Sequence, residues 1–110
     1  MKERILLTGA SGFIGTNLLE DLLKKGYEVK NLDWNKPKIE ERKSLWENVN
    51  IINYDQFEQA VLNFNPEYII HLAARTDLNG KTLEDYDQNI TGVENLMKII
   101  HKLPDLKKVI

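Results

Sequence analysis

Two patterns of apolar residues alternate along this chain and define its expected architecture. Short apolar runs predict strands at Arg4–Thr8, Glu28–Asp33, Val49–Asn53, Glu67–Leu72 and Lys107–Ile110. Apolar residues spaced three or four positions apart predict helices at Gly12–Lys25, between Asp55 and Pro66, and at Leu83–Lys102. Strands that alternate with helices form a parallel sheet with right-handed crossovers. The pattern therefore predicts an α/β, doubly wound sheet in strand order 3-2-1-4-5, truncated in its fifth strand.

Local signals refine the helices. Gly26 can take the left-handed position after the first helix. Asp55, with Glu58 three residues later, has the form of an N-cap for the second. One side of the last helix is expected to carry Tyr86, Ile90, Val93, Met97 and Ile100.

Two stretches lack either pattern and are expected to be loops. Trp34–Asn48 is polar and contains a proline, with room for one helical turn around Arg42–Trp46, and Arg75–Lys81 surrounds a glycine. The strand Glu67–Leu72, by contrast, is too continuously apolar to be wet on one face, so it should be central.

Composition narrows the class of protein. The 110 residues, 42% hydrophobic and 29% charged, predict one globular domain over 1–110. A net charge of −2 from scattered charges predicts no nucleic-acid surface, and no apolar run approaches the roughly 20 residues of a membrane span. There is no cysteine, and the two histidines lie in no metal-binding motif. Without the features of a signal peptide, the protein is expected to be cytoplasmic.

The candidate chemistry begins at Thr8-Gly9-Ala10-Ser11-Gly12-Phe13-Ile14-Gly15, between the first strand and the first helix. A strand that turns through three glycines into a helix is how α/β proteins hold the pyrophosphate of a dinucleotide. The glycines allow a tight turn, a close approach to phosphate and close packing of helix on strand. The helix start adds free N–H groups and the positive end of its dipole. A P-loop is a poor alternative, because its Gly-Lys-Ser/Thr ending is missing.

Asp33 closes the second strand. A carboxylate there can accept hydrogen bonds from both hydroxyls of an adenosine ribose and would repel a 2′-phosphate. The combination predicts a Rossmann-like domain that binds NAD in preference to NADP. The alternative interpretation is that the glycines only make turns and that Asp33 is a solvated strand end.

Four segments together resemble the extended short-chain dehydrogenase/reductase family, whose members include NAD-dependent nucleotide-sugar epimerases and dehydratases. The matches are Thr8–Gly15, Asp33, His71-Leu72-Ala73-Ala74 and Asn89–Leu96, in the family's order and over nearly the whole chain. The resemblance implies that the chain is the amino-terminal, NAD-binding portion of such an epimerase, dehydratase or reductase, whose parent protein takes a nucleotide-sugar substrate. It does not choose among the members.

The resemblance also implies roles for particular residues. Backbone from Ser11 to Ile14 should contact the pyrophosphate, Leu72-Ala73-Ala74 should line the cofactor, and Asn89 should lie behind its nicotinamide half. The family reads adenine with an acid and an aliphatic residue after the third strand, where Asn53 and Tyr54, or instead Asp55, can stand. His71 is expected to be structural. The candidate cofactor-binding residues are Gly9, Ser11, Gly12, Phe13, Ile14, Gly15, Asp33, Asn53, Tyr54, Leu72, Ala73, Ala74 and Asn89.

The catalytic residues of that family are not found in this sequence. The family uses a Ser or Thr after the fifth strand and a Tyr-x-x-x-Lys pair on the next helix, where the lysine lowers the pKa of the tyrosine. None of the four tyrosines has a lysine four positions later. No catalytic residue is therefore assigned to this chain, and the parent protein is expected to supply them.

Two other interpretations stay open. The chain could be a stand-alone dinucleotide-binding module without chemistry, or a flavodoxin-like domain of unrelated purpose. If the fold is truncated, the edge of the fifth strand and nearby helix faces should be apolar and exposed. Such a surface predicts self-association into a homo-oligomer.

Overall fold

The computed structural model describes residues 3–11, 13–33, 44–72 and 83–110. Within them five strands form one parallel sheet in the order β3-β2-β1-β4-β5, which confirms the predicted topology. A flavodoxin-like sheet has the order 2-1-3-4-5, so that interpretation is wrong. The strands are β1 (Arg4–Thr8), β2 (Glu28–Asp33), β3 (Trp46–Asn48), β4 (Tyr68–His71) and β5 (Lys108–Val109). The helices are α1 (Phe13–Lys24), α2 (Tyr54–Phe64) and α3 (Leu83–Ile100).

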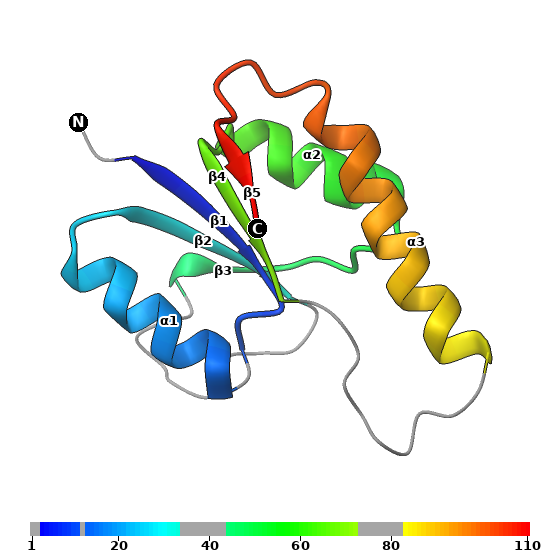
Figure 1. Ribbon diagram of the computed structural model, residues 1–110, viewed down its shortest axis with the longest axis horizontal. Helices are drawn as coiled ribbons and strands as arrows, with labels where there is room; N and C mark the ends of the chain where they lie inside the picture. The colour runs from blue at the N-terminus through cyan, green and yellow to red at the C-terminus, as the bar shows by residue number, and fades with distance from the viewer. Residues whose placement is uncertain (1–2, 12, 34–43, 73–82) are drawn as a thin grey trace.

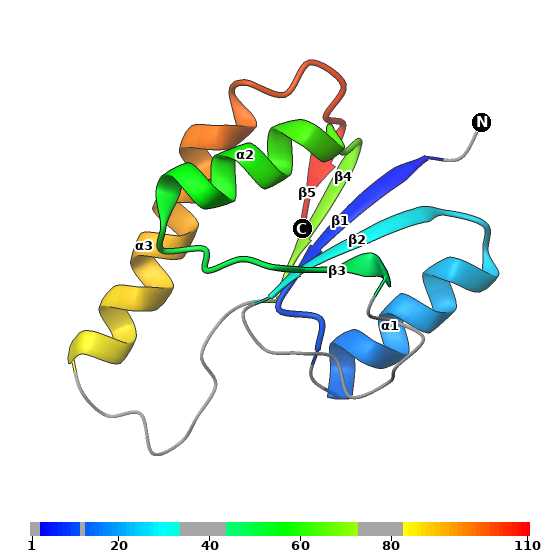
Figure 2. The same cartoon turned by 180° about the vertical axis from the view of Figure 1, so that it is seen from behind.

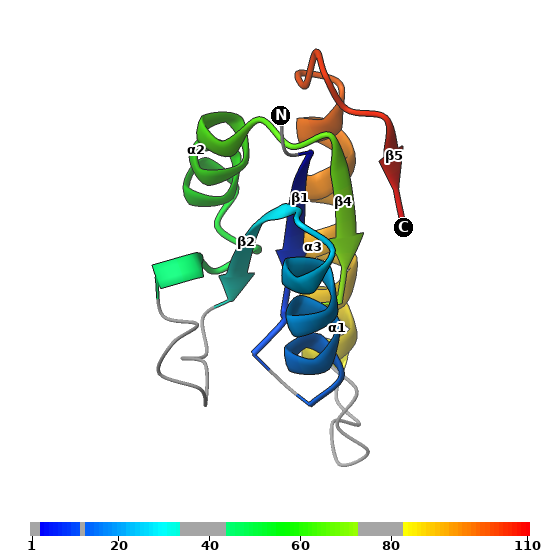
Figure 3. The ribbon, with the colours of Figure 1, turned by 90° about the vertical axis from the view of Figure 1, so that its left-hand side faces the viewer.

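Helices cover both faces of the sheet, so the molecule has three layers (Figure 1). α1 packs on one face against Ile5 and Leu7. α2 and α3 pack on the other face around Leu6, Leu32 and Ile69 (Figures 2 and 3). Successive side chains of a strand point to opposite faces, so Ile5, Leu6 and Leu7 contribute to both cores. β4 lies between β1 and β5, which confirms its predicted interior position.

The third strand was predicted too late in the sequence. It is formed by Trp46–Asn48 and not by Val49–Asn53, and Asn48 is in register with Asp33. The indole Nε1 of Trp46 donates to the carbonyl of Asp33 at 2.7 Å. The apolar residues that follow are buried for another reason: Val49 belongs to the core beneath α2 and α3, and Ile51 packs against it. The connection between β3 and α2 is partly buried, so its sequence shows the same run of apolar residues as a strand.

The ends of the helices follow local chemistry. Asn53, not Asp55, is the N-cap of α2, because its Oδ1 accepts a hydrogen bond from the Gln56 amide at 3.2 Å. At the other end Asn65 takes a left-handed conformation with φ of 50°, directly before Pro66. Gly26 has φ of +88°, as predicted. The loop expected at 75–81 and most of the stretch expected at 34–48 lie outside the described residues.

Of the residues predicted to share one side of α3, Ile100 packs against the core, three are exposed, and the side chain of Tyr86 lies outside the described residues. Ile90, Val93 and Met97 are 55%, 44% and 50% exposed, whereas Leu96 and Ile99 of the same helix are buried in the core. The apolar stripe, here defined as Ile90, Val93 and Met97, therefore faces solvent. Of the helices described, none is long and apolar enough to cross a membrane.

Candidate functional site

The predicted site residues gather at one edge of the sheet. β1 has β2 on one side and β4 on the other. The chain builds the sheet from β1 towards β3 and then crosses back to add β4 and β5 on the other side of β1. The glycine segment follows β1, Asp33 ends β2 and Leu72 follows β4, all at the carboxyl edge (Figure 1). Open α/β sheets bind ligands in the crevice outside such a switch point.

Two glycines of the segment, Gly9 and Gly15, stand where a side chain is disfavoured. Gly9 has φ of +70°, a conformation that side chains disfavour, and its N–H donates to the carbonyl of Leu32 at 2.9 Å. A Cβ on Gly15 would lie 2.3 Å from the Cα of Ala10, so no side chain fits where α1 packs on the turn. Gly12 and the side chain of Phe13 lie outside the described residues. Ile14, in the first turn of α1, has a side chain that is 73% exposed.

Asp33 is joined to the glycine segment from the neighbouring strand. Its Oδ2 accepts a hydrogen bond from the Ser11 amide at 3.2 Å, and the residue is only 8% exposed. The interpretation of Asp33 as a solvated strand end is therefore wrong. Asn31, two positions earlier and on the same face, accepts from the Ala10 amide at 2.9 Å. Asn31 was not among the predicted site residues, because only two of the six residues of β2 are apolar and a further polar residue there does not stand out.

The end of β4 is held by a second polar contact. Thr8 Oγ1 lies 2.7 Å from His71 Nδ1, and the Leu72 amide donates to both the carbonyl and the hydroxyl of Thr8, at 2.9 and 3.1 Å. Burial lowers the pKa of His71 below its ordinary value. His71 is thus bonded within the sheet, in keeping with the structural role expected for it. Leu72 is half-buried beside the α1 core, and Ala73 and Ala74 lie outside the described residues.

The candidate adenine-reading residues have other contacts. The side chain of Asn53 caps α2, and the ring of Tyr54 packs on the core with Lys98 and Lys102 at 5.9 and 5.8 Å from its centroid. Asp55 is exposed in the first turn of α2. Their adenine role stays a prediction.

An amide and an aliphatic side chain lie nearer to the end of β3. Asn50 and Ile51 follow the strand almost directly, and Asn95 Nδ2 donates to the Ile51 carbonyl at 2.9 Å. A Cβ on Gly92 would lie 2.5 Å from Ile51 Cδ1, so α3 approaches this segment closely. Sequence reasoning missed the pair because it placed the third strand over it. Asn89 lies in α3, with its side chain outside the described residues.

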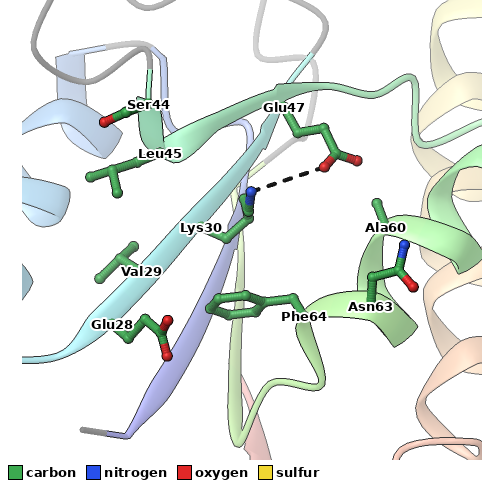
Figure 4. Close-up of a pocket in the computed structure, with 9 residues that line it drawn as sticks. All are labelled: Glu28, Val29, Lys30, Ser44, Leu45, Glu47, Ala60, Asn63 and Phe64. Carbon is green, nitrogen blue, oxygen red and sulfur yellow. Dashed lines mark ion pairs between the residues drawn. The ribbon is translucent and has the colours of Figure 1, made fainter.

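A hollow of about 350 Å³ lies elsewhere, between the amino-terminal half of β2 and the last turns of α2 (Figure 4). Lys30 and Glu47 form an ion pair of 4.0 Å across it. Among the residues that the structure describes, no predicted site residue lines this hollow. Those that line it are Glu28, Val29, Lys30, Ser44, Leu45, Glu47, Ala60, Asn63 and Phe64.

Comparison with known proteins gives one consistent result. Residues 5–110 match the model of the NAD dependent epimerase/dehydratase family. The chain is 34% identical to a UDP-N-acetyl-alpha-D-glucosaminuronate decarboxylase of Bacillus cytotoxicus, covering 100% of the chain and 36% of that protein. It is 29% identical to a UDP-glucose 4-epimerase of Mycoplasma pneumoniae, covering 99% of the chain and 34% of that protein.

Solved structures agree. The UDP-glucose 4-epimerase of Thermus thermophilus, in complex with NAD, has a TM-score of 0.84 at 29% identity over 96% of this chain and 36% of its own. The enzyme WbmG of Bordetella bronchiseptica, in complex with NAD and UDP, has a TM-score of 0.80 at 26% identity over 99% and 37%. The chain thus spans about a third of the length of these relatives.

Proposed function

The chain belongs to the NAD-dependent epimerase/dehydratase family, and from this premise we propose that residues 1–110 form the NAD-binding domain of an enzyme that acts on a nucleotide sugar. One observation carries the proposal most directly. The buried Asp33 carboxylate is hydrogen-bonded to the glycine turn at the switch point of the sheet. The relatives described above are named for catalytic activities, which does not support a stand-alone binding module.

The pyrophosphate is proposed to lie against the start of α1. The first N–H groups of a helix have no partner within it, and the helix dipole favours an anion there. The N–H groups of Gly9, Ala10 and Ser11 point instead to the end of β2. The donors proposed for the phosphates are therefore the amides of Phe13 and Ile14. The missing Cβ of Gly15 lets this first turn lie close to Ala10, in the turn that follows β1.

The adenosine is proposed to lie beyond the ends of β2 and β3. The Asp33 carboxylate ends β2 on this side of the sheet, and we propose that it accepts hydrogen bonds from the ribose hydroxyls. The family places an acid and then an aliphatic residue after the third strand. We propose Asn50, an amide in place of the acid, and Ile51 for these positions rather than Asn53 and Tyr54. The support is the observed end of β3 at Asn48 and the use of the Asn53 side chain as a helix cap.

The nicotinamide half is proposed to lie towards β4 and the start of α3. Leu72, Ala73, Ala74 and Asn89 remain the proposed lining residues on this side. Bound NAD supplies hydride acceptance and return, while the residues of this chain bind and orient it. Proton transfer is assigned to no residue here, because no Tyr-x-x-x-Lys pair occurs in the sequence.

We also infer that the protein self-associates. Support comes from the solvent-facing apolar stripe of α3. Exposed apolar patches promote association. The cytoplasmic location expected from the sequence stays a prediction.

Titration of the purified protein with NAD tests the central proposal. We expect a dissociation constant below about 1 mM by calorimetry, and binding of NADP at least about tenfold weaker, because a 2′-phosphate would meet the Asp33 carboxylate. Absence of NAD binding at millimolar concentration, or equal affinity for NAD and NADP, would contradict the assignment.

A further inference from the structure

Asn31 reaches from the middle of β2 to the glycine turn. Its side chain is 1% exposed and lies next to Leu7 of β1 in the sheet register. Its Oδ1 accepts from the Ala10 amide at 2.9 Å, and its Nδ2 donates to the Ser11 hydroxyl at 3.2 Å. Position 31 belongs to none of the four segments that carry the resemblance to the family.

Three consecutive amides of the turn are fixed by the last three residues of β2. The Gly9 amide donates to the carbonyl of Leu32, the Ala10 amide to the side chain of Asn31, and the Ser11 amide to the side chain of Asp33. The main-chain bond to Leu32 is independent of side-chain identity. The other two depend on the residues that β2 presents on this face.

We propose that Asn31 is a positioning residue that holds the glycine turn in its cofactor-binding conformation before ligand arrives. The proposal rests on the proposed function, in which this turn precedes the amides that receive the pyrophosphate of NAD. A side-chain amide suits the position because it supplies an acceptor and a donor together. It satisfies Ala10 and Ser11 without adding a second negative charge beside Asp33.

The burial of the turn makes this contact consequential. Ala10 is 2% exposed, so its N–H cannot turn to water without movement of the turn. A buried N–H that loses its partner is costly, and an apolar residue at position 31 therefore favours a displaced turn. In such a variant NAD would have to move the turn back to its binding conformation, which uses part of the binding free energy. In the wild type the turn already has that conformation.

The variant Asn31→Leu tests the proposal, since leucine keeps the branched outline of asparagine and removes both hydrogen bonds. We expect NAD to bind about tenfold more weakly, the scale of one buried hydrogen bond. Adenosine, which lacks the pyrophosphate, should bind within about twofold of the wild type. By hydrogen exchange monitored with NMR, the Ala10 amide should exchange at least about tenfold faster in the ligand-free protein.

Val29→Ala is the matched control. Val29 lies on the same strand and face, is 3% exposed, and belongs to the α1 core. Its truncation should lower the melting temperature. The NAD affinity should stay unchanged, and so should the exchange rate of the Ala10 amide once the change in global stability is taken into account. Equal losses of NAD affinity in both variants would overturn the proposal, as would unchanged NAD affinity in Asn31→Leu.

Asn31→Asp provides a second measurement if the leucine variant does not fold. Aspartate retains an oxygen for the Ala10 amide, so that amide should stay protected; fast exchange there would overturn the assignment of Oδ1. If the wild type binds no NAD, the proposed function fails. The exchange rate of Ala10 in Asn31→Leu then decides alone, with faster exchange supporting the role of Asn31 and unchanged exchange overturning it.

Discussion

The hydroxyl of Thr8 lies 2.7 Å from Nδ1 of His71 and joins the carboxyl ends of β1 and β4. Thr8 is fully buried, and the Leu72 amide also donates to its hydroxyl. The contact therefore fixes the point where the chain leaves β4, beside the glycine turn. Since a threonine hydroxyl can both donate and accept, it can donate to a neutral His71 while it accepts from Leu72.

The stability of the protein should depend on the charge of His71. Burial lowers the pKa of His71 in the folded state, whereas the unfolded chain keeps a value near 6.5. The unfolded state therefore binds the proton more readily, and stability falls as the pH drops below about 6.5 towards the folded pKa. Above that range the contribution is complete. Urea unfolding between pH 7.5 and 5 measures this slope.

His71→Asn is the control for that experiment, because an amide can replace the ring as a partner for Thr8 and does not titrate. The variant should lose this part of the pH dependence while other groups keep theirs. An identical slope in wild type and variant would assign the acid sensitivity to groups other than His71.

Gly15→Ala should disturb both folding and cofactor binding. The added Cβ would lie 2.3 Å from the Cα of Ala10 and 2.8 Å from its carbonyl oxygen, so backbone must move. Overpacking of this kind costs about 1–3 kcal/mol, and displacement of α1 should weaken NAD binding at least about tenfold. Urea unfolding and NAD titration measure the two effects.

A second glycine separates backbone strain from damage to the site. Gly26 has φ of +88° with no atom within 4 Å of an added Cβ, at the far end of α1 from the glycine turn. Gly26→Ala should cost about 1–2 kcal/mol through strain alone and leave NAD affinity unchanged. If both variants lose NAD affinity equally, Gly15 has no special place in the site.

Asp33→Asn should reduce the discrimination between NAD and NADP. Asparagine keeps an oxygen that can accept from the Ser11 amide, as Asp33 does at 3.2 Å, but it removes the negative charge. The ratio of the NADP to the NAD dissociation constant should fall at least about tenfold, because repulsion of a 2′-phosphate is lost. Parallel calorimetric titrations measure the ratio, and an unchanged ratio would mean that another group excludes NADP.

The half of the fold around α1 could be predicted from the sequence because its signals are local. β1, α1 and β2 are marked by apolar periodicity and by the glycines, and the predicted bounds differ from the observed ones by at most one residue. Asp33 is the last residue of β2, so its position at the end of the strand could be predicted together with the strand. The role of Asn31 could not, because its partners, the Ala10 amide and the Ser11 hydroxyl, are remote in the sequence.

The region of β3 and α3 could not be predicted in the same way because it depends on packing between distant segments. Ile51 is held by Gly92, which lets α3 approach, and by Asn95, which bonds its carbonyl. Gly92 and Asn95 are not hydrophobic residues, so a pattern of apolar spacing does not mark their side of the helix. It marked the side of Val93 and Met97. The buried side of α3 is chosen by shape and hydrogen bonding as well as by hydrophobicity.

Charged substitutions on the apolar stripe should reduce self-association without unfolding the protein. Met97 is 50% exposed and Val93 is 44% exposed, so glutamate at either position remains hydrated and costs little stability. Ile99 on the opposite side is fully buried, and Ile99→Glu should unfold the chain because an unpaired charge would enter the core. Light scattering over a range of concentrations, with circular dichroism as the folding control, compares the three variants. A wild type that stays monomeric at high concentration would refute self-association. Equal association of the wild type and Met97→Glu would place the contact outside the apolar stripe.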